Sequence, residues 1–191
     1  MSRITRLCCV FWLAASALPA VAHPFQSVSG SFASGFAHPF MGLDHLLAMI
    51  AVGVWAVQQG GSAMWRVPLA FCTGMALGAV LGYLGFAASL VEPLIAGSVF
   101  ALGLLILKKR TFAPAFQVAF VGFFALFHGA AHAMEQVLGT VPWLALAGLV
   151  GATLILHLGG MLTARALRDW MRVAGVPLAG TGLWLLSRVV I

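Results

Sequence analysis

The sequence predicts an all-α membrane protein with six transmembrane helices after a cleaved signal peptide. Hydrophobic residues make up 62% of the 191 residues and charged residues only 7%, with a mean hydropathy of +1.07. This leaves too little polar surface for a soluble domain of that length. Six apolar runs are each near the length that crosses a bilayer, where a segment of that size must pair its own backbone as a helix. The runs cover roughly residues 41 to 59, 67 to 89, 92 to 107, 114 to 134, 142 to 163 and 175 to 190.

Residues 1 to 22 have the layout of a secretory signal peptide. Arg3 and Arg6 precede an apolar run from 7 to 18, and Ala-Val-Ala at 20 to 22 is a small-x-small cleavage site. We expect the mature chain to begin at His23, outside the cytoplasm. The alternative is an uncleaved first transmembrane helix, for which the run is short of the ~20 residues that a span needs.

No helix or strand is predicted between the cleavage site and the first apolar run. Residues 23 to 37 are rich in Ser, Gly and Phe without an apolar period, which is typical of loops. We therefore expect an exposed periplasmic leader over 23 to 40, followed by a transmembrane domain over 41 to 191.

The basic residues predict the orientation of the helices. With the mature N-terminus outside, the connections after the first, third and fifth runs face the cytoplasm, where Lys and Arg are enriched. Those connections carry Arg66, Lys108, Lys109, Arg110, Arg165, Arg168 and Arg172, and the connections on the other side carry none. The net charge of +6 is thus explained by topology in the inner membrane of a bacterium. Because the charges form short clusters, we expect no nucleic-acid partner.

Two stretches place ionisable side chains inside this apolar chain. HPFMGLDHLLAM, at 38 to 49, opens the first helix, and FHGAAHAME, at 127 to 135, ends the fourth. The topology puts both at the outer side of the membrane. Spacings of i, i+4 and i+7 place the three ionisable residues of the second stretch on one helical stripe. The candidate ligands are His38, Asp44, His45, His128, His132 and Glu135.

We predict that the two stretches meet and hold a divalent metal ion. Ionisable groups in hydrocarbon are costly and need partners, and this nitrogen and oxygen set suits Ni, Co, Zn or Cu better than Mg or Ca. His45 should therefore approach His132 closely enough to share an ion. Pro39 should push His38 out of helical geometry, so that His38 covers the site or contacts the ion first. The alternative is that these residues only hydrogen-bond one another and join the first helix to the fourth.

Three further residues are candidates for ion contact. Met49 lies one turn below His45. The free α-amine and imidazole of His23 would be able to chelate an ion after cleavage. His157 lies deeper in the fifth helix, where it forms either a second ion position or a lone interhelical hydrogen bond.

The second helix carries small residues at four-residue spacing, which predict close packing against another helix. They are Ala70, Gly74, Gly78 and Gly82.

The two stretches resemble the motifs of the HupE/UreJ family of nickel and cobalt permeases. The pattern His-Pro-x-x-Gly-x-Asp-His matches from His38 to His45, and Phe-His-Gly-x-Ala-His matches from Phe127 to His132. Ala133 stands where the family usually has Gly. The resemblance implies a secondary transporter or facilitator, not an enzyme, that takes up nickel or cobalt for maturation of a hydrogenase or urease. The ion would be the transported substrate, with no permanently bound cofactor.

Two other classes of protein use similar residues. A membrane zinc-dependent hydrolase would use the same ligands to activate water, but it needs a cleft and an open coordination position. A bis-His haem protein would place Asp44 and Glu135 at high cost beside the porphyrin. The sequence contains no Gly-x-x-x-x-Gly-Lys-Ser or -Thr loop, so we expect no ATP hydrolysis by this chain.

Overall fold

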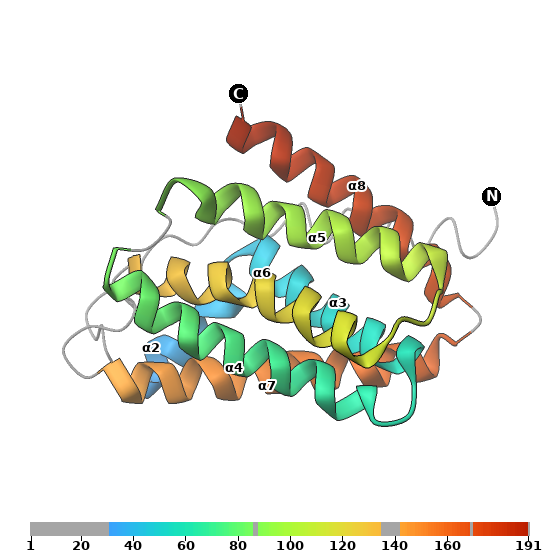
Figure 1. The fold of residues 1–191 in the computed structure, drawn as a ribbon, viewed down its shortest axis with the longest axis horizontal. Helices are drawn as coiled ribbons and strands as arrows, with labels where there is room; N and C mark the ends of the chain where they lie inside the picture. Colours follow the sequence, from blue (N-terminus) through green and yellow to red (C-terminus); the bar gives the residue numbers. More distant parts are fainter. Residues whose placement is uncertain (1–30, 86–87, 135–141, 169, 191) are drawn as a thin grey trace.

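A computed structural model describes residues 31–85, 88–134, 142–168 and 170–190 (Figure 1). The signal peptide, its cleavage site and His23 lie outside these ranges. Every regular element in the described residues is a helix, and none is a strand. In order, the elements are α2 (Phe32–Ala37), η2 (His38–Phe40), α3 (Leu43–Gln59), α4 (Ala63–Tyr83), η3 (Ala88–Leu90), α5 (Val91–Lys108), α6 (Pro114–Met134), α7 (Pro142–Ala166) and α8 (Met171–Val190).

Four of the described helices are long and apolar enough to cross a membrane: α4, α5, α6 and α7. A fifth span results if α2 and η2 are counted together with α3, to which they are bent by 84°. The helix α8 is not among the helices that are long and apolar enough to cross. The all-helical, multi-pass character is therefore confirmed, while six spans and a cleaved leader stay predictions.

The helices follow the predicted runs, with one clear error. The second run was expected to continue to residue 89, but α4 ends at Tyr83 and a turn follows, with Gly85 at φ +80°. A positive φ is accessible to Gly without steric cost. Hydropathy does not detect such a turn, because the residues on both sides of it are apolar.

The chain before α3 is not an exposed leader over its whole length. Ser31 caps α2 by accepting a hydrogen bond from the Ser34 backbone N–H at 3.1 Å. The helix then lies directly on α7: a methyl group at Gly35 would overlap the Ala145 backbone, and one at Gly148 would overlap that of Phe32. The prediction of an exposed segment without a regular element is therefore wrong from residue 31 onward, while its placement in the periplasm stays a prediction.

Close contacts through glycine join α4 to α6. Methyl groups at Gly74, Gly78 and Gly82 would each crowd the α6 backbone, at Gly122, Leu126 and Ala130 respectively. The packing that the small-residue ridge predicted is therefore confirmed. It allows the two backbones to approach without a layer of side chains between them.

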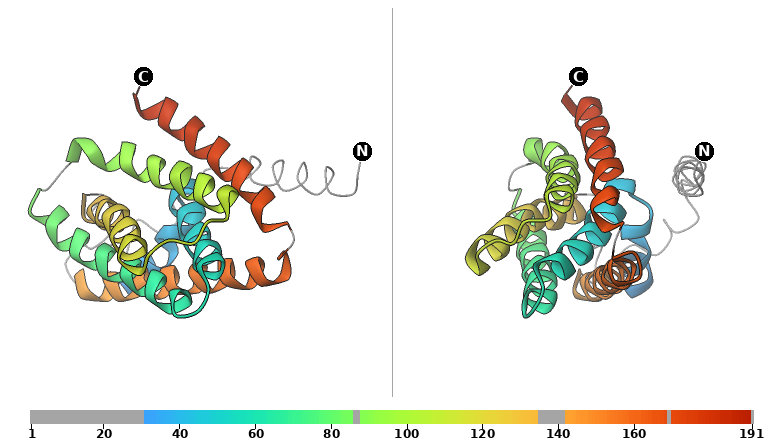
Figure 2. Two further views of the ribbon diagram at one scale, coloured as in Figure 1. Left: turned by 45° about the vertical axis from the view of Figure 1, so that its right-hand side comes forward. Right: turned by 90° about the vertical axis from the view of Figure 1, so that its right-hand side faces the viewer.

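The helices α3 and α7 also cross at glycines. Gly53 lies against the His157 backbone, and Gly160 lies against that of Ile50. On the other side of the bundle, α5 pairs with α8 through Gly103, Gly175 and Gly182. The C-terminal part of α8 projects from the bundle, as both Figure 1 and Figure 2 show.

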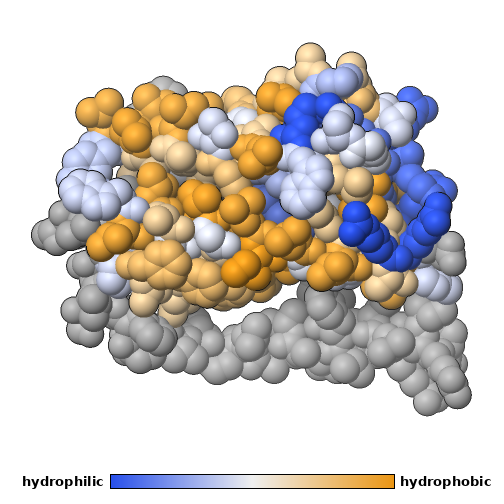
Figure 3. Space-filling view, turned by 90° about the horizontal axis from the view of Figure 1, so that it is seen from below, coloured by the Kyte–Doolittle hydropathy of each residue, from blue (hydrophilic) through white to orange (hydrophobic). Residues whose placement is uncertain are grey.

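The two ends of the bundle differ in polarity. The connections α3–α4, α5–α6 and α7–α8 lie together at the right-hand end in Figure 1, and hydrophilic side chains gather at that end in Figure 3. Lys108 and Arg165 are exposed there. Arg66 of the same end donates to Gln117 Oε1 at 2.7 Å, and Gln117 donates to Gln59 Oε1 at 3.2 Å. This distribution fits the predicted cytoplasmic side.

Two adjacent glycines test whether close packing of α3 on α7 stabilises the fold. Gly160→Ala should lower the stability by about 1–3 kcal/mol, because the methyl group must displace the Ile50 backbone. Gly159 faces open space, so Gly159→Ala should leave stability unchanged or raise it slightly through helix propensity. Thermal unfolding of both variants in detergent measures the difference. Equal melting temperatures would contradict close packing at this crossing.

Candidate metal site

The first motif is positioned by a break between two helices. The backbone N–H of His38 donates to the Ser34 carbonyl, so His38 completes the last turn of α2. Its φ and ψ of −57° and −47° are helical, and the prediction that Pro39 forces it out of helical geometry is wrong. Pro39 instead occupies the first turn of η2, where a missing N–H costs nothing. The chain then turns at Gly42, and α3 begins with Asp44 and His45 in its first turn.

The imidazole rings of the two motifs meet in the interior. The ring centres of His45 and His132 are 4.8 Å apart, and those of His45 and His128 are 4.9 Å apart. His38 lies 4.7 Å from His132 by the same measure. The predicted approach of His45 to His132 is therefore confirmed, although α3 packs mainly on α7 and α6 mainly on α4.

Asp44 fixes the proton of the His45 ring. Its Oδ1 accepts hydrogen bonds from the backbone N–H of His45 at 2.7 Å and from Nδ1 of the ring at 2.9 Å. Because a carboxylate only accepts, Nδ1 carries the proton and Nε2 keeps its lone pair. Among the described residues, the buried Nε2 has no hydrogen-bond partner.

Ser98 of α5 has the same effect on His128. The Ser98 hydroxyl donates to the Ile95 carbonyl at 2.6 Å, and its oxygen lies 3.0 Å from His128 Nε2. Since the one hydroxyl proton is already used, Nε2 must be the donor. Nδ1 of His128 then holds the lone pair, and it too lacks a partner in the described part of the chain.

Within the described part of the chain, His132 is held by packing alone. Neither of its ring nitrogens has a hydrogen-bond partner among the described residues, and the side chain is fully buried. A buried polar atom without a partner costs about 1–3 kcal/mol. Among the described residues, His45, His128 and His132 therefore do not bond to one another, although the alternative interpretation also included Glu135, which lies outside the described ranges.

Accessibility falls from His38 inward. His38 is half-buried, the Asp44 side chain is 21% exposed, and His45 is 7% exposed. The exposed fraction of His128 and of His132 is 0%. The cluster thus presents its outer members to the surface and its inner members to the core.

The spacing of the rings suits a shared ion, but their present orientation does not. Within the described ranges, no three His, Cys, Asp or Glu side chains could hold a metal ion as they stand. An ion about 2 Å from each of two imidazole nitrogens would place the ring centres roughly 5 Å apart. The observed separations of 4.7 to 4.9 Å agree with that value, so it is the direction of the ring nitrogens that must change. Coordination therefore requires the rings to turn.

A further buried imidazole, that of His157, lies deeper than the cluster. His157 Nδ1 is 2.7 Å from the Met49 carbonyl, so this nitrogen is the donor and α7 is bonded to α3. The interhelical hydrogen bond that was one of the two alternatives for His157 is therefore present. Phe71 contacts both the His128 ring of the cluster and the deeper His157 ring. Its ring centre is 5.4 Å from that of His128 and 5.2 Å from that of His157.

Two of the predicted ligands are not described by the structure, and two residues that contact the cluster were not predicted. His23 and Glu135 lie outside the described residues. Ser98 and Phe71 contact the cluster and were not predicted. Ser98 is the only hydroxyl in the run from 92 to 107, which is a usable signal, whereas nothing distinguishes Phe71 from the other aromatic residues.

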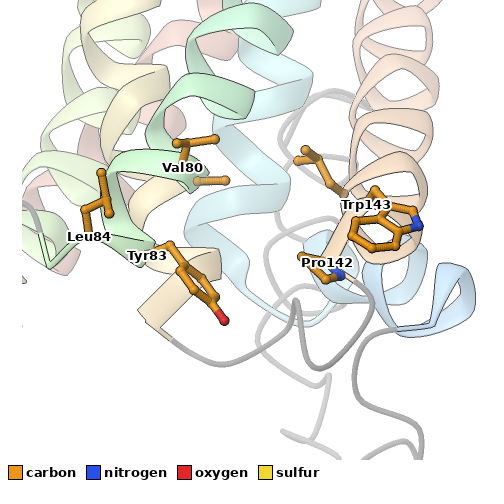
Figure 4. A pocket seen from close by; sticks show the side chains of 7 residues that line it. Val80, Tyr83, Leu84, Pro142 and Trp143 are labelled. Atoms are coloured by element: carbon orange, nitrogen blue, oxygen red, sulfur yellow. The ribbon is translucent and has the colours of Figure 1, made fainter.

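An apolar groove nearby is not part of the site. It has a volume of about 290 Å³ and lies between the end of α4 and the start of α7 (Figure 4). Its lining contains none of the predicted ligands. Tyr83 and Trp143, both 69% exposed, border it, as aromatic residues commonly do at the level of lipid headgroups.

Comparison with known proteins identifies similarity over most of the chain. Residues 11–185 match the family model described as HupE / UreJ protein. Protein HupE of Rhizobium leguminosarum bv. viciae is 44% identical over 180 residues, which cover 90% of this chain and 94% of that protein. No solved structure matches.

The proton positions of the histidines are testable without metal. Ser98→Ala should change the ring-nitrogen resonances of His128, because the ring loses the acceptor that holds its proton on Nε2. Ser187→Ala is the matched control: its hydroxyl also donates to a carbonyl within its own helix, at Trp184. Solid-state NMR of protein with isotope-labelled histidine measures both. An unaltered His128 signal in Ser98→Ala would exclude the assigned tautomer.

Proposed function

Because the chain belongs to the HupE/UreJ family, we propose that it takes up a divalent transition metal ion from the periplasm. Nickel is the first candidate and cobalt the second. The protein acts as a secondary transporter or facilitator in the inner membrane of a bacterium, with its mature N-terminus in the periplasm. The ion supplies the maturation of a metalloenzyme such as a hydrogenase or a urease.

One observation carries this proposal: imidazole rings with unpaired nitrogens lie close together in an apolar interior. His45 Nε2, His128 Nδ1 and both nitrogens of His132 lack partners among the described residues. Neutral imidazole is a common ligand of transition metals, and hydrogen bonds to the opposite ring nitrogen orient such ligands. Asp44 and Ser98 supply those bonds here.

The order of burial suggests the order of contact. An ion entering from the periplasm meets His38 first, because His38 is the most accessible of the four rings of the cluster. His45 and His132 follow, and their lone pairs replace water on the ion. The carboxylates of Asp44 and Glu135 offset the charge of the dication, which would otherwise be costly in a medium of low dielectric constant.

The charge of Asp44 is essential in this proposal. Asp44→Asn should abolish uptake, because the amide oxygen can still accept both hydrogen bonds from His45 but the negative charge is gone. Uptake of radioactive nickel by cells that express the variant measures the effect, with membrane fractions confirming equal protein levels.

Asp169→Asn is the control for removing an acidic group. It removes a carboxylate that follows Arg168 directly in the sequence, far from either motif, and it should leave uptake unchanged. Wild-type uptake by Asp44→Asn at low nickel concentration would refute the role of Asp44.

His23 is proposed to collect ions when they are scarce. After cleavage, its α-amine and imidazole form a chelating pair, and a fraction of both is deprotonated at neutral pH. His23→Ala should raise the half-saturating nickel concentration several-fold and leave the maximal rate unchanged, because capture limits uptake only at low concentration. N-terminal sequencing must show normal cleavage. An identical uptake curve over the full concentration range would remove His23 from the pathway.

A further inference from the structure

A second buried set of donor atoms lies one helical turn below the histidine cluster. It comprises Met49 on α3, Met75 on α4, and Thr153 and His157 on α7. All four side chains are at most 1% exposed. Met49 follows His45 by one turn of the same helix, so the second set is continuous with the first.

His157 offers a bare nitrogen to this set. Its Nδ1 donates to the Met49 carbonyl at 2.7 Å, because a carbonyl can only accept. Nε2 therefore keeps its lone pair, and it has no hydrogen-bond partner in the described part of the chain. This hydrogen bond to the backbone also restrains the ring, as outer hydrogen bonds do for histidine ligands.

Two thioether sulfurs converge on one hydroxyl beside it. Thr153 Oγ1 lies 3.4 Å from Met49 Sδ and 3.7 Å from Met75 Sδ. A hydroxyl has one proton, so it serves only one sulfur at a time. Thr153 and His157 are four residues apart and share a face of α7. The two sulfurs thus lie one turn of α7 from the His157 ring, where α3, α4 and α7 meet.

We propose that His157, Met49 and Met75 form a second, deeper position for the transported ion. This inference rests on the proposed function and extends it. The donors are one imidazole and two thioethers, and no carboxylate takes part. Such donors favour soft and borderline transition metals over Mg²⁺, Ca²⁺ and Mn²⁺. Without a negative charge, the position holds a dication weakly, as a site of passage must.

The competing explanation is ordinary core packing. Methionine fills irregular gaps in apolar cores, and a lone interhelical hydrogen bond is common between membrane helices. The two explanations differ in what the sulfurs do when metal is present, so the experiment must observe the sulfurs directly.

Three variants of the full-length protein separate these explanations. Met49→Leu combined with Met75→Leu removes both sulfurs at nearly constant volume. His157→Asn keeps an N–H donor for the Met49 carbonyl and removes the second ring nitrogen. Met171→Leu is the control, since Met171 is a buried core methionine at the start of α8. Thermal unfolding in detergent establishes that all three fold like the wild type.

The measurements are X-ray absorption of the purified protein loaded with nickel alone, and nickel uptake by cells. The wild type and Met171→Leu should show sulfur among the nickel ligands, and the double variant should not. Both the double variant and His157→Asn should lose most of the maximal uptake rate while the half-saturating concentration stays unchanged, because the outer cluster is intact.

Two results overturn the inference in different ways. A wild-type spectrum with only nitrogen and oxygen ligands, together with normal uptake by the double variant, rejects the deeper position and leaves the proposed function standing. A wild type that neither binds nickel nor takes it up rejects the proposed function, and the deeper position with it.

Discussion

Hydrogen bonds to one side of each imidazole determine what the other side can do. Asp44, Ser98 and the Met49 carbonyl each accept a hydrogen bond from an N–H group of a buried ring, so the neutral rings of His45, His128 and His157 each retain one lone pair. An apolar interior offers no water to pair these lone pairs, and leaving them unpaired costs free energy. The fold bears that cost at one end of the bundle, where the two motifs meet.

Glycine makes this arrangement possible. Where α4 meets α6 and α3 meets α7, backbones touch directly and no side chains separate them. Larger residues at those positions would hold the helices apart and move the rings out of reach of one another. The histidines supply the chemistry of the site, and the small residues supply the distances between them.

Much of the site could be predicted because ionisable residues are rare in apolar runs. Asp44, His45, His128 and His132 were identified for that reason, and the positive charges gave their depth. Ser98 stands out in the sequence as the only hydroxyl of its run, but its contact with His128 could not be predicted, since a serine in a membrane helix usually bonds its own backbone. The packing of α2 depends on Gly148, which is distant in sequence. The geometry of His38 depends on a helix that the composition of the segment concealed.

The glycine contacts also divide the site between two bodies. Because α4 and α6 lie backbone to backbone, as do α3 and α7, each pair lacks the compliant layer of side chains that absorbs sliding, and we expect each to move as a unit. His45 belongs to one unit and His132 to the other. A small shear between the units would change the distance between these rings while every glycine contact within a unit stayed intact, because the boundary between the units runs through the histidines.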